Sequence, residues 1–180
     1  MVVSRKKLGA LLQAQGYDDF QWLDPKQIVV AQWVRQKCLF GCPEYGHNAA
    51  CPPNTPSVEE CARFFREYRH AAVLHFAKQV ARPGDRHAWT RKINRGLLKL
   101  EREVFVAGHR KAFVLFMDSC GLCKSCSDTR AGCKNLAGAR PAPEAMAVDV
   151  FTTVRRAGYE LEVLSSYDQT MNRFSLLMVE

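Results

Sequence analysis

The sequence lacks a long hydrophobic run. Its longest apolar stretches, such as Ala112–Met117 and Leu176–Val179, are far shorter than the roughly 18 residues of a membrane-spanning helix. The first twenty residues contain neither the uninterrupted apolar segment nor the small-residue cleavage site of a secretory signal. We therefore expect no membrane association and a cytoplasmic location, where reducing conditions keep cysteines out of disulfides.

Several motifs of well-known catalytic sites are also missing. The chain has no G-x-G-x-x-G pattern, no P-loop and no H-E-x-x-H pattern. The C-x3-C-x2-C spacing of radical SAM enzymes is absent as well, because the next cysteine after Cys42 is Cys51. The sequence therefore leaves open whether the protein is an enzyme.

What is present is the composition of a packed globule. Of the 180 residues, 47% are hydrophobic and 10% are aromatic, which excludes a disordered or collagen-like chain. No internal repeat or low-complexity segment interrupts the sequence. We therefore expect residues 1–180 to form a single domain, and nothing in the sequence indicates its oligomeric state.

The eight cysteines fall into two groups separated by 58 cysteine-free residues. Because disulfides are not expected, metal or cluster ligation is the alternative, and thiolate is the soft ligand that zinc, copper(I) and iron–sulfur centres select. The two groups predict cysteine-rich metal or cluster loops at 38–56 and 120–135. The first group holds Cys38, Cys42, Cys51 and Cys61, and the second holds Cys120, Cys123, Cys126 and Cys133.

The second group has the spacing C-x2-C-x2-C-x6-C. Its first three cysteines match the bacterial ferredoxin pattern, whereas Cys133 comes after six residues and is followed by Lys134 instead of proline. Structural zinc sites typically use two C-x2–4-C pairs separated by a dozen or more residues. The spacing therefore favours a 4Fe–4S cluster bound by all four cysteines, with zinc as the alternative.

The first group lies mostly in a rigid, turn-rich loop containing glycines and prolines. Cys61 differs, because Ser57 and Glu60 form a capping box for a helix on which Cys61 shares one face with aromatic residues. We predict that Cys61 lies in the core. Cys38, Cys42 and Cys51 then remain for a second centre. The fourth ligand of that centre stays open among Cys61, His47, a cysteine of the other group and a small molecule.

The remaining pattern predicts a mixed α/β sandwich with helices packed on a small sheet. Strands at 71–76 and 111–117 are apolar on both faces, as in a sheet that helices cover on both sides. Both cysteine loops would follow strands and lie at one edge of the sheet. The predicted helices are 5–15, 58–69, about 87–107 and about 144–157; the predicted strands are 27–34, 71–76, 111–117, 159–164 and 174–179, with a turn at 82–85.

The positive charge is concentrated on one helix. Residues 82–111 hold nine Lys and Arg against three acids, which accounts for six of the eight net positive charges. On the predicted helix 87–107 an apolar stripe (Trp89, Ile93, Leu97, Leu100 and Val104) lies opposite a basic one (Arg91, Arg95, Lys99 and Arg102). A solvated face is the simplest interpretation, and docking of an acidic redox partner is a second one. Two cubanes would lower the net charge to about +4, so we do not expect nucleic-acid binding by an iron–sulfur protein. We therefore expect a role in electron transfer or as a redox accessory; the alternative is a zinc-stabilised binding module that uses this helix for nucleic acid or an acidic protein partner.

Three separated segments resemble one known family. GHNAACPPNTP, CGLCKSCSDTRAGCKN and ARPAPEAMAVDVFTTVRRAGYELEVL together look like the domain of unknown function described as predicted metal-binding proteins, over about Gln27 to Val179. The resemblance implies metal or iron–sulfur binding by all the cysteines except Cys61, and it implies no enzymatic activity. The family's R-P-x-x-E-A-M-x-x-D pattern falls on Arg140, Pro141, Glu144, Ala145, Met146 and Asp149.

The Arg140–Asp149 segment allows two interpretations from its chemistry. Arg140 and nearby amides could donate hydrogen bonds to cluster sulfides, which would raise a reduction potential. The alternative is an ordinary salt bridge with a helix N-cap, in which Glu144 and Asp149 flank the first turns of a helix. We expect Met146 to be a packing residue.

Overall fold

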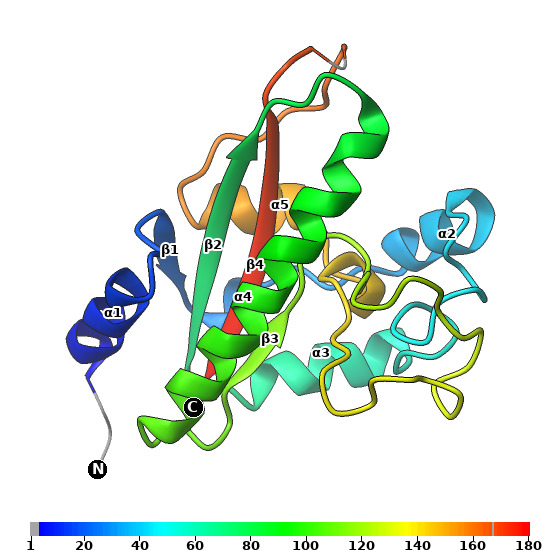
Figure 1. Ribbon diagram of the computed structural model, residues 1–180. Helices are drawn as coiled ribbons and strands as arrows, with labels where there is room; N and C mark the ends of the chain where they lie inside the picture. The colour runs from blue at the N-terminus through cyan, green and yellow to red at the C-terminus, as the bar shows by residue number, and fades with distance from the viewer. Residues whose placement is uncertain (1–3, 167) are drawn as a thin grey trace.

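The computed structural model describes residues 4–166 and 168–180, which form a four-stranded antiparallel sheet between two layers of helices (Figure 1). The spatial order of the strands is β1–β2–β4–β3. The predicted mixed α/β sandwich is confirmed. The strands are β1 (Phe20–Leu23), β2 (His70–Lys78), β3 (Phe113–Leu115) and β4 (Met171–Val179).

The two layers follow from the alternation of side chains along each strand. On β2, Ala72 and Leu74 face α1 (Arg5–Ala14) and α4 (Arg86–Val106), whereas Ala71 and Val73 face α3 (Val58–Arg66) and α5 (Val150–Arg156). In Figure 1, α4 crosses in front of the sheet and α5 lies behind it. The sheet is therefore buried on both faces, as its apolar strands predict.

Most of the predicted elements are present with shifted ends. The capping box of α3 is confirmed, because Ser57 Oγ accepts from Glu60 N at 3.2 Å while the Glu60 carboxylate accepts from Ser57 N at 2.8 Å. The predicted turn at 82–85 contains the short 3-10 helix η2 (Pro83–Asp85). Helices α1, α3 and α4 and strands β2, β3 and β4 correspond to predicted elements.

Two predicted strands are wrong. Residues 27–34 contain the end of a 3-10 helix, η1 (Pro25–Gln27), an isolated bridge between Val30 and Val148, and the start of α2 (Gln32–Gly41). Residues 159–164 form no strand: Leu161 is their only buried residue, and Val163 is 81% exposed. The fourth strand of the sheet is β1, which the pattern did not predict.

The predicted helix 144–157 is broken into η3 (Glu144–Met146) and α5. Between them Ala147 takes a left-handed conformation, with φ at 59°. The cause is the crossing segment 29–31: Ala31 N donates to the Ala147 carbonyl at 2.9 Å, and Asp149 N donates to the Val29 carbonyl at 2.8 Å. These bonds take the backbone groups that a continuous helix would use.

Candidate metal site

Seven of the eight cysteines line one cavity of about 690 Å³, which falls within the roughly 300–1,000 Å³ of small-ligand sites. The eighth, Cys61, is fully buried in the core, with its Sγ 3.9 Å from Met146 Sδ, as predicted. Met146 is also buried, as predicted. The cavity cysteines are the predicted ligands Cys38, Cys42, Cys51, Cys120, Cys123, Cys126 and Cys133.

The first cysteine group is positioned by α2. Cys38 lies on this helix and Cys42 at its C-cap, so the expectation that a strand leads into this loop is wrong. Arg35 fixes the helix, since its Nη2 donates to the carbonyls of Pro56 and Ala145, each at 3.1 Å. Helix α2 therefore carries two of the three cysteines of the first group to the cavity wall.

Burial makes two thiols of this group hard to ionise. It raises the pKa of Cys51 to about 12, with a smaller contribution from the nearby Glu44 carboxylate. Burial also raises the pKa of Cys38, and the neighbouring Cys42 adds to the effect. Because metals bind thiolates, binding at these two residues must displace protons.

The second cysteine group follows the edge strand β3, as predicted, and its loop is tied to the first one. The backbone N–H of Ala49 donates a hydrogen bond to Cys126 Sγ, with an N···S distance of 3.4 Å. The Asn54 side chain donates to the Asp128 carbonyl at 2.8 Å and accepts from Arg130 N at 3.2 Å. Segments about 75 residues apart in the sequence therefore form one unit, which lies to the right in Figure 1.

Helix α4 holds the start of the second loop through Asn94, which is fully buried. Its Nδ2 donates to the Met117 carbonyl at 3.0 Å and lies 3.3 Å from the carbonyls of Ser119 and Cys120. Its Oδ1 accepts from Met117 N at 3.0 Å. Asn94 therefore fixes the backbone at the point where the chain enters the loop.

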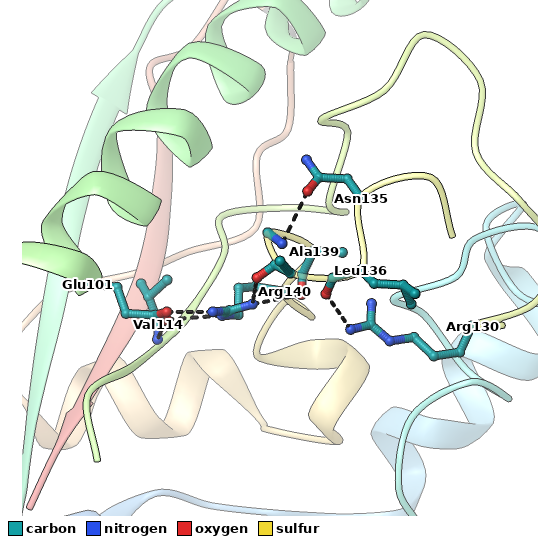
Figure 2. A network of polar contacts seen from close by, with 9 residues as sticks. Glu101, Val114, Arg130, Asn135, Leu136, Ala139 and Arg140 are labelled. Atoms are coloured by element: carbon teal, nitrogen blue, oxygen red, sulfur yellow. Dashed lines mark hydrogen bonds and ion pairs between the residues drawn. The ribbon is translucent and has the colours of Figure 1, made fainter. Parts of the chain in front are cut away.

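The same helix holds the end of the second loop through Glu101, as Figure 2 shows. The Glu101 carboxylate accepts from Arg140 Nη2 at 2.5 Å, from Arg140 Nε at 3.0 Å and from Val114 N at 2.7 Å. Arg140 Nη1 in turn donates to the carbonyls of Ala137 and Ala139 at 2.9 and 3.1 Å. Arg140 thus links the loop to α4 and, through Glu101, to β3.

These contacts decide between the two interpretations of the Arg140–Asp149 segment. The Arg140 side chain is engaged by Glu101, and Asp149 caps α5 by accepting from Thr152 N at 3.1 Å and from Thr152 Oγ1 at 2.6 Å. The salt bridge and the helix N-cap are both present. The Arg140 guanidinium therefore has a structural role: it connects the end of the second loop to α4.

The sequence pattern does not reveal that Asn94 and Glu101 anchor the second loop, because it predicts an apolar buried stripe on their helix. Leu97, Leu100 and Val104 are buried as predicted, but Trp89 and Ile93 are only half-buried. Thr90, Asn94 and Glu101 take the buried positions instead. A polar residue at helical spacing from buried leucines was the signal that could have identified them.

The cavity wall is rich in charge. Basic groups come from the first turns of α4 (Arg86 and Arg91) and from the second loop (Lys124 and Lys134), against the acids Glu44, Asp118 and Glu144; His87 also lines the wall. Asp118 has a left-handed backbone, with φ at 55°, and its carboxylate accepts from Thr90 Oγ1 at 2.9 Å. Glu144 is exposed and lies on this wall.

The donor set fits a thiophilic metal in its chemistry. Within residues 4–166 and 168–180, however, no three His, Cys, Asp or Glu side chains converge closely enough to hold one ion. His47, one candidate for the fourth ligand, is exposed, and its Nδ1 lies 3.5 Å from the Asp128 carboxylate. The seven cysteines therefore surround a common space, and their side chains would have to turn inward to ligate a metal.

Comparison with known proteins identifies the class. The family described as predicted metal-binding protein (DUF2284) matches residues 21–179, and the chain belongs to this family. No curated protein and no solved structure matches the chain. In the part of the chain that the structure describes, no helix is long and apolar enough to cross a bilayer.

Proposed function

We propose that the protein binds iron–sulfur centres through its seven cavity cysteines and acts in electron transfer or as a redox accessory protein. One observation carries the proposal: all seven cysteines other than Cys61 line the same cavity. Cys120, Cys123, Cys126 and Cys133 would hold a 4Fe–4S cluster. Cys38, Cys42 and Cys51 would hold a second centre with one position open.

Donors beside the sulfurs support this choice of cofactor. Ala49 N donates to Cys126 Sγ at 3.4 Å. The Arg130 Nη1 atom lies 4.0 Å from Cys133 Sγ. Hydrogen bonds to the sulfurs are among the features by which proteins tune the reduction potential of a cluster.

The charge of the wall supports it as well. A cubane core of about +2 with four thiolates carries about −2, which is costly to bury without nearby positive charge. Arg86, Arg91, Lys124 and Lys134 supply that charge around the cysteines. Against three acids (Glu44, Asp118 and Glu144), these four cations leave a small excess of positive charge, which offsets an anionic centre held by thiolates.

The redox partner would approach along α4. The basic groups that this helix contributes to the cavity wall continue into exposed ones farther along it, namely Lys92, Arg95, Lys99 and Arg102. A surface of one sign raises the encounter rate with a partner of the opposite sign. An acidic electron donor or acceptor would thus be guided to the mouth of the cavity.

The deciding experiment is a metal and sulfide analysis of protein purified without oxygen. We expect a brown protein with absorption near ~400 nm and about eight irons per chain if both centres are cubanes. Replacing Cys126 with alanine should remove about half of the iron, whereas the matched control Cys61→Ala should retain all of it. A colourless protein with stoichiometric zinc would refute the proposal and support a zinc-stabilised binding module.

A further inference from the structure

A second cavity of about 560 Å³ adjoins the cysteine cavity and shares part of its wall. The shared residues are Cys38, Cys42, Asp118 and Glu144. The other walls come from α2, α5, the segment 161–164 and β4. Anything bound in this second cavity would therefore lie against two of the three cysteines of the first group.

The lining of the second cavity is mainly apolar and partly aromatic. Trp33 is 49% exposed and Phe151 is 36% exposed, although large apolar side chains are normally covered. Phe174 forms a further wall from β4. Aromatic walls of this kind favour a flat, apolar ligand, which gains from stacking as well as from burial.

The charges of the lining exclude a ligand with a full negative charge. Asp118 is paired with Arg173 at 3.3 Å, and Asp149 is engaged at the N-terminus of α5. Glu144 and Glu162 then face a single remaining cation, Lys37. A further anion would add to a local excess of negative charge.

Arg173 supplies hydrogen-bond donors to this wall. Its Nε atom is buried and lies 3.3 Å from Asp118 Oδ1, but the side chain as a whole is 30% exposed and lines the cavity. Among the described residues, its Nη2 has only a distant contact, 4.0 Å from Met171 Sδ. A guanidinium that brings such terminal donors to a mainly apolar wall suits an uncharged oxygen acceptor, because a guanidinium donates hydrogen bonds and accepts none.

We propose that this cavity binds an uncharged, flat organic molecule that carries a carbonyl oxygen. The aromatic walls hold its apolar body, and Arg173 donates to the carbonyl oxygen. The ligand lies beside the centre proposed for Cys38, Cys42 and Cys51, which has three thiolates and an open position. Only that last placement depends on the proposed function.

The test uses anaerobically purified, metal-loaded protein and the fluorescent ketone 6-propionyl-2-(dimethylamino)naphthalene, which is flat, neutral and blue-shifted in apolar surroundings. We expect saturable binding of one probe per chain. Phe151→Ala and Arg173→Gln should each weaken it about tenfold. The matched control Phe105→Ala, which alters an exposed phenyl group lining neither cavity, should bind the probe like the wild type.

The charge preference is tested by titrating 2-naphthoate, which should bind at least tenfold more weakly than the ketone. Absence of saturable binding, equal losses in Phe105→Ala and Phe151→Ala, or tight binding of the naphthoate would each overturn the proposal. Circular dichroism verifies that each variant is folded. If Arg173→Gln does not fold, the Phe151→Ala variant and the naphthoate titration test the proposal without it.

The placement is tested by the visible spectrum of the bound metal. Saturating probe should alter the iron–sulfur absorption, or the cobalt(II) bands of a cobalt-substituted protein if the metal proves to be zinc. A spectrum that does not respond to bound probe would overturn the placement beside Cys38 and Cys42. If the purified protein contains zinc, the proposed function is refuted. The fluorescence titration still decides whether the second cavity binds the ketone.

Discussion

Replacing Asn94 with alanine should weaken the whole protein and its metal site together. The asparagine is fully buried and makes 3.0 Å hydrogen bonds with both the N–H and the carbonyl of Met117. The substitution leaves these two backbone groups without partners, in a place that water does not reach. It also frees the strand end that leads to Cys120.

The cost follows from those two groups. Each stranded buried group costs about 1–3 kcal/mol, so the pair costs roughly 2–6 kcal/mol. Alanine returns about 0.5 kcal/mol through its higher helix propensity. We therefore expect a loss of about 1.5–5.5 kcal/mol from the free energy of unfolding, a large share of the 5–15 kcal/mol typical of a domain.

The assay is urea unfolding of metal-free, reduced protein, together with metal analysis of the same variant. The control is Lys92→Ala, an exposed position on the same helix, which should change stability by less than about 0.5 kcal/mol. Asn94→Ala should also retain less metal than the wild type. If it lost under 1 kcal/mol and kept a full metal load, the anchoring role of Asn94 would be refuted.

Three further predictions concern the same region. Glu101→Ala should cost about 3–5 kcal/mol, because it strands the buried Arg140 charge; chemical unfolding measures this, and a loss as small as that of an exposed substitution would contradict it. The double variant Glu101→Met, Arg140→Met should recover part of the loss, with Val114 N still unpaired, and a double variant less stable than Glu101→Ala would contradict the desolvation argument. Asn54→Ala should remove the two hydrogen bonds that Asn54 makes to the second loop, so hydrogen exchange should accelerate in residues 47–54 and 126–133 but not in β2. Equal exchange would show that the other contacts between the loops suffice to hold them together.

The fold could be predicted where the pattern is local and failed where the backbone has a distant partner. The capping box at Ser57 and the apolar strands β2 and β3 lie in continuous segments, so periodicity identified them. The break at Ala147 depends on residues 29–31, more than a hundred positions away. No local pattern carries that information.

The candidate site shows the same limit. Spacing separated the cavity cysteines from Cys61, because a capped amphipathic helix already accounts for Cys61. Spacing could not reveal that both groups face one cavity, since this depends on Asn54 and Ala49 meeting the second loop. Nor could it reveal Asn94 and Glu101, whose function depends on the strand that α4 covers.

The contacts of α4 with both ends of the second loop have a thermodynamic consequence. Closing a flexible loop of about 20 residues costs an entropy equivalent to roughly 2.7 kcal/mol, from the term (3/2)RT ln n. Asn94 holds one end of the loop and the Glu101–Arg140 pair holds the other, so the loop is already closed when the sheet and α4 fold. The entropy of closure is therefore lost during folding and not when the metal binds. Stripping the metal should therefore leave the far-ultraviolet circular dichroism nearly unchanged. This protein would be a preorganised receptor, unlike zinc fingers, which the metal itself must fold.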